Sequence, residues 1–320
     1  LGVVYGTDFL HCDLEEVVPA FAACARAGQF EFDRWGIEAP ETIHPLWMLK
    51  YLPNMPACHI GIANDARGPN NSVTLGDVSS LTAIDEAVHV IRRGQADVMI
   101  AGGTGSRLQP SVWVRSFLGQ VSHRGVSPAL ASRPFDKNRD GVVNGEGAAA
   151  IVLERREHAQ ARRAKVLATI RATSTRFEPR QADGSLKGKA IAGVIQATLE
   201  EANLTPANIG HVNAHGLSTT TDDKIEAQAI RATLGDVPVF APKSYFGNLG
   251  SGGGSVELVA SVLALQERIV PPTLNFDEPD PECPVNVVHG KPLTDTCTIA
   301  LKLSHSPTGH AAAMLISAAE

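Results

Sequence analysis

The sequence predicts an α/β fold made of two similar halves, residues 1–163 and 164–320. Apolar runs of strand length alternate with amphipathic stretches of helix length, which is the pattern of sheets covered by helices. In each half, a strand leads through a sharp turn into a central helix. We expect both central helices to be apolar on nearly every side, as helices buried between sheets are. The arrangement indicates a duplication, although the halves share no visible sequence repeat.

The first half contains one clear unit of strand, helix and strand. Residues 72–75 are expected to be extended, and residues 79–93 place Leu81, Ile84 and Val88 at helical spacing. Gly94 ends this helix, because glycine readily adopts the left-handed conformation found after a helix C-terminus. Further strands of this half are expected at residues 1–5, 96–101 and 149–153.

The second half repeats this order. Helices are expected over residues 189–202 and 255–268, the second of them after a glycine-rich turn at 247–254. The strands of this half are expected at residues 166–172, 209–214, 238–241, 287–288, 298–303 and 311–317.

The composition excludes several classes of protein. With 43% hydrophobic and 19% charged residues, the chain can bury a large core. No stretch approaches the roughly 20 apolar residues of a membrane span. A net charge of −6 argues against nucleic-acid binding, which needs a concentrated basic surface.

The cysteines indicate a reducing compartment, and we predict a cytoplasmic protein. They are odd in number, scattered, without a CxxC pair, and no secretory leader precedes them. The five are Cys12, Cys24, Cys58, Cys283 and Cys297. Because the chain opens at Leu1 directly into a strand-like segment, we also expect residues upstream of it.

Two motifs resemble ligand-binding loops, and we interpret both as structural. Residues 136–141 begin like a calcium-binding loop, but Glu146 falls one position early for the last ligand, and Pro134 breaks the preceding helix. The glycines of 247–254 match neither the P-loop nor the GxGxxG pattern of nucleotide-binding loops. We expect them to permit close backbone approach. His215 ends a buried strand, where α/β folds place reactive groups, although a satisfied core histidine is equally compatible with the pattern. We predict neither a metal nor a cofactor.

Several segments in colinear order form a specific signature. They are Gly68-Pro69-Asn70, residues 96–103, residues 133–147, Val212-Asn213-Ala214-His215-Gly216 with Ser218-Thr219, residues 223–227, Lys243-Ser244 and residues 270–275. Through these segments, along essentially its whole length, the chain resembles the β-ketoacyl-[acyl carrier protein] synthases, the elongating condensing enzymes of fatty-acid and polyketide synthesis. The family's first strand and helix have no counterpart before Leu1.

The resemblance implies a thiolase-like fold of five layers, αβαβα, and a decarboxylative Claisen condensation. In the family, a cysteine at the start of the central helix carries the acyl group as a thioester. Two histidines assist the decarboxylation of malonyl carrier protein. A thiol suits the first role because a helix N-terminus lowers its pKa.

This sequence departs from the family pattern at most of the decisive positions. Asp77 stands at the position of the nucleophilic cysteine, and Asn248 at that of the second histidine, while His215 and Lys243 match the family's histidine and lysine. Residues 304–310 replace the gating loop, with Pro307 in place of its phenylalanine, beside His305 and Thr308 at the expected substrate gate.

We weigh three hypotheses for a site with these substitutions: condensation, another reaction on thioesters, and a non-catalytic role. An aspartyl acyl intermediate is a mixed anhydride, so condensation is disfavoured, and Asp77 can be a simple helix cap. A decarboxylase, hydrolase or acyltransferase acting on acyl-carrier-protein thioesters, using His215, Asp77 and Asn248, is the enzymatic alternative. We favour a non-catalytic partner resembling a chain-length factor, in a homodimer or in a heterodimer with an active ketosynthase, that meets an acyl carrier protein.

Overall fold

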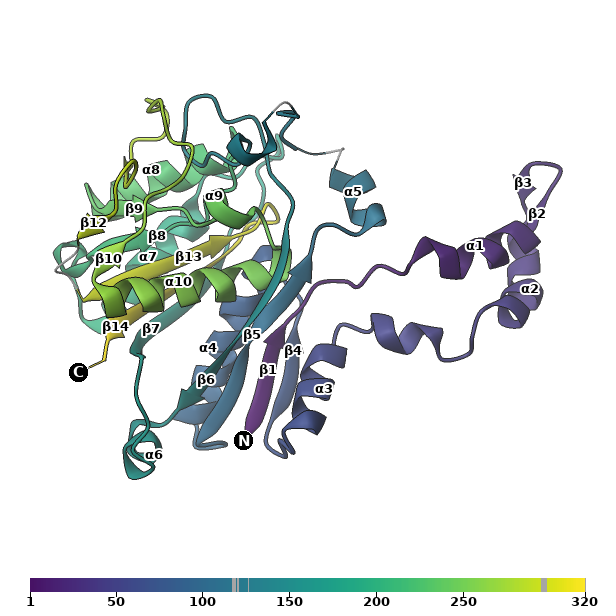
Figure 1. The fold of residues 1–320 in the computed structure, drawn as a ribbon, viewed down its shortest axis with the longest axis horizontal. Helices are drawn as coiled ribbons and strands as arrows, with labels where there is room; N and C mark the ends of the chain where they lie inside the picture. Colours follow the sequence, from purple (N-terminus) through teal and green to yellow (C-terminus); the bar gives the residue numbers. More distant parts are fainter. Residues whose placement is uncertain (117–118, 120, 126, 295–297, 320) are drawn as a thin grey trace.

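The computed structural model describes residues 1–116, 119, 121–125, 127–294 and 298–319, which form two sheets with helices between and around them (Figure 1). The first sheet has four strands in the order β4-β1-β5-β6. Their bounds are Asn70–Val73 for β4, Gly2–Gly6 for β1, Val98–Ser106 for β5 and Glu146–Glu154 for β6. Strand β1 runs parallel to both of its neighbours and is buried at all five positions, as expected for a strand covered on both faces.

The second sheet has six strands in the order β11-β9-β8-β13-β14-β7. They are Asn286–Val287 (β11), Pro238–Phe240 (β9), His211–Asn213 (β8), Ile299–His305 (β13), His310–Ala318 (β14) and Ala168–Phe177 (β7). Residues along β14 alternate between two cores. Ala311, Ala313 and Leu315 face the outer core, whereas Ala312, Met314 and Ile316 face the core between the sheets.

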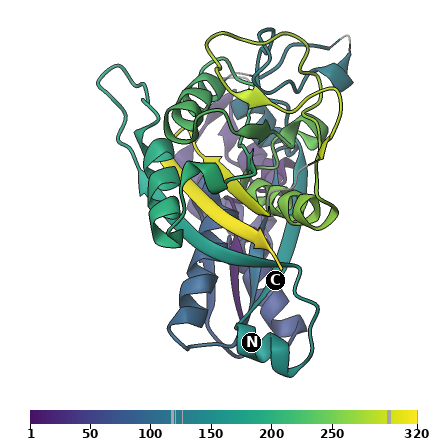
Figure 2. The same cartoon turned by 90° about the vertical axis from the view of Figure 1, so that its left-hand side faces the viewer.

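The helices complete five layers, and the predicted αβαβα architecture is confirmed. The central layer holds α4 (Ser79–Arg92) and α10 (Gly253–Glu267), which contact each other and both sheets. Helix α3 (Met55–Ala63) packs on the outer face of the first sheet. Helices α7 (Lys189–Ala202) and α8 (Asp222–Leu234) cover the second sheet, whose yellow strands lie among helices in Figure 2. Helix α8 was not predicted from the sequence pattern.

The two central helices differ in their surroundings. Helix α10 is apolar around most of its circumference, as expected, apart from the buried Glu257. The prediction for α4 is wrong in its last turns, because His89 and Arg92 are exposed and Arg93, just after the helix, pairs with Glu86 at 2.8 Å. At their N-termini the helices touch closely, with the Ser255 backbone N–H donating to Ser80 Oγ at 3.0 Å.

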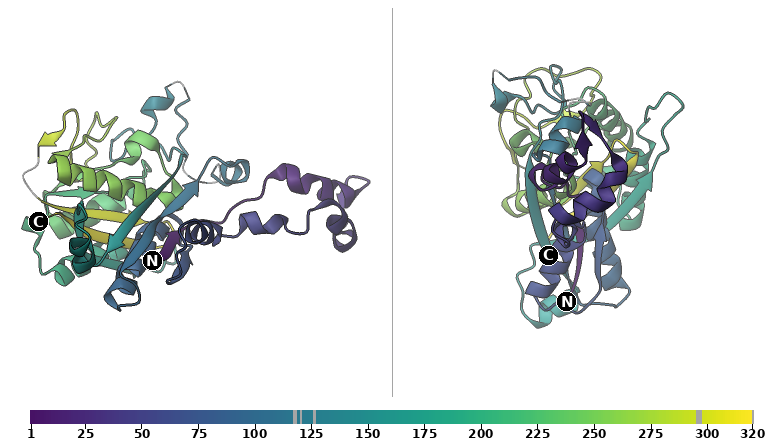
Figure 3. Two further views of the ribbon diagram at one scale, coloured as in Figure 1. Left: turned by 60° about the horizontal axis from the view of Figure 1, so that its bottom comes forward. Right: turned by 90° about the vertical axis from the view of Figure 1, so that its right-hand side faces the viewer.

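An arm formed by residues 8–54 projects away from the two sheets (Figures 1 and 3). It contains α1 (Leu14–Ala23), the two-residue strands β2 and β3 (Ala25–Arg26 and Gln29–Phe30), and α2 (Trp35–Thr42). A 3-10 helix, η2 (Trp47–Tyr51), leads back to the body. At its root, Thr7 Oγ1 donates to the Pro53 carbonyl at 2.9 Å and Gln109 Nε2 donates to the Cys12 carbonyl at 3.0 Å.

Short elements make up the remaining structure. They are α5 (Pro110–Ser116), α6 (Arg156–Ala161), α9 (Lys243–Phe246), β10 (Ile269–Val270), β12 (Leu293–Thr294), η1 (Phe32–Arg34), η3 (Gly76–Val78), η4 (Pro128–Leu130), η5 (Pro206–Asn208) and η6 (Gly250–Gly252). Among the described residues, none of these or the longer helices has the length and apolarity needed to cross a bilayer.

Candidate functional site

Asp77 lies in η3, immediately before the first turn of α4, and its side chain is only 5% exposed. Its Oδ1 accepts a hydrogen bond from Arg107 Nη2 at 2.6 Å. The N-cap positions of η3 and α4 are held by Leu75 and Val78, so Asp77 does not occupy the cap position of either helix. The carboxylate is instead neutralised by a guanidinium.

Arg107 follows directly after strand β5 and was not predicted as a site residue. Its side chain is 27% exposed, and its Nη2 also lies 3.9 Å from Asp8 Oδ2 at the root of the arm. The charge of Asp77 is the main cause that raises the pKa of Arg107 above its ordinary value. Arg107 therefore links the position before α4 to the base of the arm.

His215 follows the end of β8, and Lys243 is the first residue of α9. Both side chains are buried and lie in contact with each other. Lys243 Nζ lies 3.0 Å from His215 Nδ1, 2.9 Å from the His215 carbonyl oxygen and 2.5 Å from Glu257 Oε1. The three ammonium protons therefore have three acceptors. Because an ammonium only donates, Nδ1 of His215 accepts, and the ring proton lies on Nε2.

Glu257 also forms an ion pair with a second buried cation. Its Oε2 accepts a hydrogen bond from Lys302 Nζ, which also lies 3.2 Å from the Ala214 carbonyl oxygen. Burial lowers the pKa of Lys302 to about 8, although the Glu257 carboxylate opposes this effect. Neither Glu257 nor Lys302 was predicted, yet each is a single charge inside an apolar helix or strand. That pattern is the sequence signal that would have found them.

The ring of His215 has a hydrogen-bond donor, Nε2–H, for which the described residues provide no acceptor. Burial, followed by the charge of Lys243, lowers the pKa of His215 well below its ordinary value, so the ring is neutral. Its Nε2 is buried, makes no hydrogen bond to any residue that the structure describes, and lies 4.0 Å from Asp77 Oδ2. An N–H in this state can donate to an oxygen atom placed between the two side chains.

Asn248 lies in the glycine-rich turn before α10 and is buried. Its Oδ1 accepts a hydrogen bond from the Gly250 backbone N–H at 3.0 Å, which turns the amide NH₂ in the opposite direction. The turn is closely packed, since a Cβ on Gly252 would lie 2.2 Å from the Gly147 carbonyl oxygen. The glycines thus serve the close backbone approach that the sequence predicts.

His305 ends strand β13 and packs against His215, with the ring centroids 4.5 Å apart and the ring planes tilted by 59°. Its Nε2 lies 3.6 Å from Glu226 Oε2. Burial opposes protonation of His305, but Glu226 outweighs it and raises the pKa of this histidine. Glu226 also accepts the backbone N–H groups of His215 and Gly216, at 2.7 and 2.8 Å.

The other two predicted gate residues lie apart from this cluster. Pro307 and Thr308 are exposed at the tip of the turn between β13 and β14. The Pro307 carbonyl oxygen accepts a hydrogen bond from Arg180 at 2.6 Å, and Thr308 Oγ1 lies 2.7 Å from Ser306 Oγ. The structure therefore brings together Asp77, His215, Lys243 and His305, with Pro307 and Thr308 outside the group.

In the loop at 136–141, the Asp136 carboxylate accepts hydrogen bonds from backbone N–H groups of the protein. Asp136 Oδ1 accepts the Asn138 N–H, and Oδ2 accepts the N–H groups of Asp277 and Glu278, each at 2.8 Å. Among the described residues, no group of three or more histidine, cysteine or acidic side chains could hold a metal ion. Asp136 therefore links its own loop to residues 277–278 through hydrogen bonds.

The four described cysteines lie outside the group formed by Asp77, His215, Lys243 and His305. Cys24 and Cys283 are buried, while Cys12 and Cys58 are half-buried outside the cluster. Burial is the main cause that raises the pKa of Cys283 to about 12, so this thiol is unreactive. The fifth, Cys297, lies outside the described residues.

The cluster presents a buried hydrogen-bond donor next to a carboxylate that is already paired with a guanidinium. His215 donates from Nε2, fixed by Lys243, and Asn248 directs its NH₂ away from Gly250. The N–H of His215 suits the carbonyl oxygen of a thioester. Asp77 is held by Arg107, which reduces its tendency to attack a carbonyl.

Comparisons with known proteins agree with this architecture. Residues 20–159 match the family "Beta-ketoacyl synthase, N-terminal domain" and residues 167–277 match "Beta-ketoacyl synthase, C-terminal domain". A putative polyketide beta-ketoacyl synthase 1 of Streptomyces virginiae is 38% identical over 76% of this chain, which spans only 58% of that protein. The 3-oxoacyl-[acyl-carrier-protein] synthase 2 of Mycobacterium bovis is 36% identical over 88% of this chain and 69% of its own length.

The solved structures include a type II polyketide ketosynthase in complex with its acyl-carrier protein. It superposes with a TM-score of 0.86 and 25% sequence identity, covering 100% of this chain and 78% of that one. Its fold is the thiolase-like fold that the resemblance implies. By sequence and by structure, the chain belongs to the β-ketoacyl synthase family.

Proposed function

We propose that this chain is a ketosynthase-like subunit of fatty-acid or polyketide synthesis that does not itself condense acyl groups. It acts as a non-catalytic partner resembling a chain-length factor. The observation that carries the proposal is the contact between the buried Asp77 and the half-buried Arg107, 2.6 Å apart at the position where the family has its cysteine. A carboxylate that attacks a thioester forms a mixed anhydride, and a guanidinium bound to that carboxylate makes the attack harder.

The hairpin turn supports the same proposal. His305 fills the space beside His215, in the segment where the family has a flexible glycine-rich gate. Its ring is buried with Nε2 3.6 Å from Glu226 Oε2, so a movement of the segment would break a buried polar contact. The retained fold and the altered site together favour a structural role in an assembly.

The acyl-enzyme test addresses the proposal directly. The natural full-length protein is incubated with acyl carrier protein bearing a thioester-linked acyl chain, and its mass is measured intact. We expect no acyl adduct and no condensation product with malonyl carrier protein. A cysteine-bearing ketosynthase from the same host serves as the positive control. A stable adduct on the unmodified protein contradicts the proposal.

The variant Asp77→Cys with Asn248→His tests how deeply the site has changed. We expect no recovered condensation, because Arg107 and the turn at 304–310 remain. Robust condensation by this variant would show that only two positions separate the chain from an active synthase.

A second candidate function is chemistry on carrier-protein thioesters without a covalent intermediate. The buried, unpartnered Nε2 of His215 favours it, because such a donor stabilises the enolate formed when a malonyl thioester loses carbon dioxide. The enolate then takes a proton to give the acetyl thioester. Mass analysis of malonyl carrier protein after incubation detects this reaction, and His215→Gln should abolish it.

A further inference from the structure

We infer that the turn between β13 and β14, residues 304–310, is a pH-dependent latch beside the candidate site. The contact between His305 and Glu226 holds it, and loss of the proton from His305 releases it. The inference goes beyond the proposed function, because it concerns access to His215 and applies whichever role the site has.

A small cavity gives His305 two different neighbours. The cavity measures about 20 Å³, enough for one water molecule, and lies between the turn and the first residues of α7 and α8. His305, Ser306 and Asp222 contribute polar groups to its lining. His305 also packs against His215, with the ring centroids 4.5 Å apart. The imidazole is therefore in contact with the cavity and with the site, and a water molecule in the cavity would give the buried ring a partner for proton exchange.

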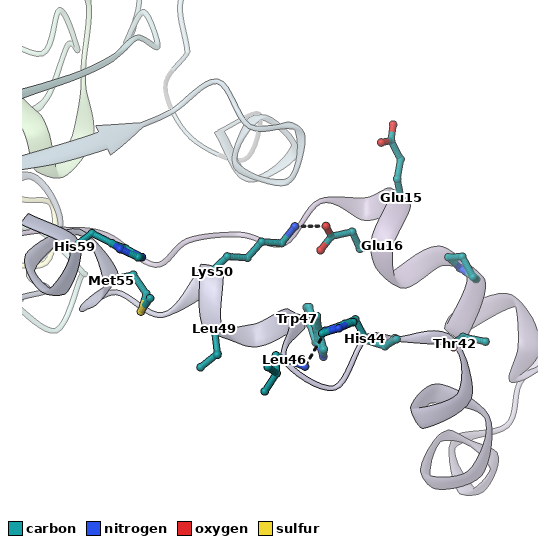
Figure 4. A pocket seen from close by; sticks show the side chains of 12 residues that line it. Glu15, Glu16, Thr42, His44, Leu46, Trp47, Leu49, Lys50, Met55 and His59 are labelled. Atoms are coloured by element: carbon teal, nitrogen blue, oxygen red, sulfur yellow. Dashed lines mark hydrogen bonds and ion pairs between the residues drawn. The ribbon is translucent and has the colours of Figure 1, made fainter. Parts of the chain in front are cut away.

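The size of a cavity does not indicate its relation to the site. A much larger hollow, of about 680 Å³, lies in the crook of the arm, where Lys50 pairs with Glu16 (Figure 4). None of the described residues that line it belongs to the cluster around His215. The small cavity reaches this cluster through His305.

The contact between His305 and Glu226 holds the buried end of the turn. His305 Nε2 lies 3.6 Å from Glu226 Oε2, and both side chains are buried. Glu226 is itself fixed in place, because its two carboxylate oxygens accept the backbone N–H groups of His215 and Gly216. A protonated His305 therefore faces a carboxylate whose position is already determined.

Other contacts hold the exposed tip of the turn. Arg180 donates to the Pro307 carbonyl oxygen at 2.6 Å, and the Glu178 backbone N–H donates to the Gly309 carbonyl oxygen at 2.9 Å. A guanidinium and a backbone amide do not change their charge near neutral pH. Loss of the proton from His305 therefore weakens the buried end of the turn and leaves the tip attached.

The charges around His305 set the direction of the switch. Burial opposes protonation, but Glu226 outweighs it, so the pKa of His305 is raised above its ordinary value of 6.5. Asp222 acts in the same direction as Glu226, and Lys243 acts against it. The contact therefore stabilises the closed turn at low pH, and this stabilisation is lost as the pH rises through the raised pKa. The titratable and charged groups near His305 are Glu226 and Asp222 of α8, Lys243 of α9, His215 after β8, Glu178 after β7, His310 of β14 and Lys302 of β13 itself.

Asp223 and Lys302 also change their charge near neutral pH. Burial raises the pKa of Asp223 to about 7 and lowers that of Lys302 to about 8. Asp223 accepts backbone N–H groups from outside the turn, and Lys302 pairs with Glu257. A variant of His305 separates its effect on the turn from theirs.

Hydrogen exchange at the turn measures the latch. The natural full-length protein is labelled with deuterium at pH 6 and pH 8, and the exchange of backbone amides within residues 304–310 is corrected for the intrinsic effect of pH. We expect their protection to fall by at least about threefold between the two pH values. In His305→Gln, which keeps a hydrogen-bond donor but carries no charge, the protection should be independent of pH. His310→Gln is the matched control, because it removes the other histidine of this hairpin, and it should behave like the unsubstituted protein.

Chemical modification of His215 tests access in the unsubstituted protein, so the inference stays testable if His305→Gln does not fold. Burial and the charge of Lys243 hold the pKa of His215 well below its ordinary value, so this ring stays neutral at both pH values. Its reaction with diethyl pyrocarbonate therefore reports access, and peptide mass spectrometry should find it at least about threefold faster at pH 8.

Four results overturn the inference. They are equal protection of the turn at both pH values, a pH dependence that persists in His305→Gln, a pH dependence that disappears in His310→Gln, and modification of His215 at a rate that does not change with pH.

Discussion

At the scale of single residues, the site is organised by charges that compensate one another. Lys243 and Lys302 share Glu257, and Arg107 neutralises Asp77, so the buried cations and anions occur in contact. Removing one member of a buried pair leaves an uncompensated charge, which costs far more than the pair contributes. This asymmetry gives the individual side chains measurable effects.

Arg107→Gln should destabilise the fold by roughly 2–3 kcal/mol, below the about 3–5 kcal/mol of fully buried pairs because Arg107 is partly exposed. The substitution leaves the Asp77 carboxylate buried without a counter-ion. The double variant Asp77→Asn with Arg107→Gln should recover much of the loss. Urea unfolding of the two single variants and the double variant measures the coupling free energy. Additive effects would show that the two side chains do not act as a pair.

Lys302 should make stability depend on pH in the alkaline range. Its pKa is about 8 in the folded state, against an ordinary value of 10.5. Between these values the unfolded chain binds a proton that the folded chain has released, so the free energy of unfolding rises with pH, and below pH 8 this gain is absent. Lys302→Met should lack the rise. Urea unfolding at pH 8 and pH 10 tests this, and an equal rise in both proteins would contradict it.

At the scale of elements, the two central helices depend on small residues where they meet the first sheet. A Cβ on Gly103 of β5 would lie 2.6 Å from Ser80 Cβ and 2.8 Å from the Ser251 carbonyl oxygen. The strand can approach α4 and η6 this closely because glycine has no side chain.

Gly103→Ala should therefore destabilise the protein by about 1–3 kcal/mol or more, the range for overpacked cores. Gly36→Ala is the matched control, because a Cβ on Gly36 meets nothing within 4 Å and alanine favours its helix, α2. Thermal or urea unfolding should separate the two variants clearly. A similar effect at both positions would contradict the packing argument.

The observed helices and strands, set against the predicted ones, show which features of the fold the sequence can predict. The helix predicted at 189–202 matches α7, and the strands at 238–241 and 311–317 fall within one residue of β9 and β14. Regular periodicity within one element predicts these features. Arg107 was missed because its partner lies 30 residues away, on an element that only the sheet order brings near. The arm was missed because its helices are too short for a strong periodic signal.

At the scale of the whole molecule, the chain divides into a well-packed body and an arm with few contacts to it. Local stability follows the density of buried contacts, so the two parts should open at different free energies. We expect backbone amides of α1 and α2 to exchange hydrogen within seconds to minutes, and those of α4 and α10 far more slowly. Peptide-resolved deuterium exchange measures the difference. Equal protection in the isolated full-length protein would contradict it.

The contact between Asp77 and Arg107 also couples two positions of the sequence. Replacing Asp77 alone would leave the half-buried Arg107 with only the more distant Asp8, 3.9 Å away, as an anionic partner, and losing Arg107 alone would leave the Asp77 carboxylate buried without its guanidinium. Either single change therefore gives a less stable protein. Substitutions at the two positions should be tolerated more readily together than one at a time.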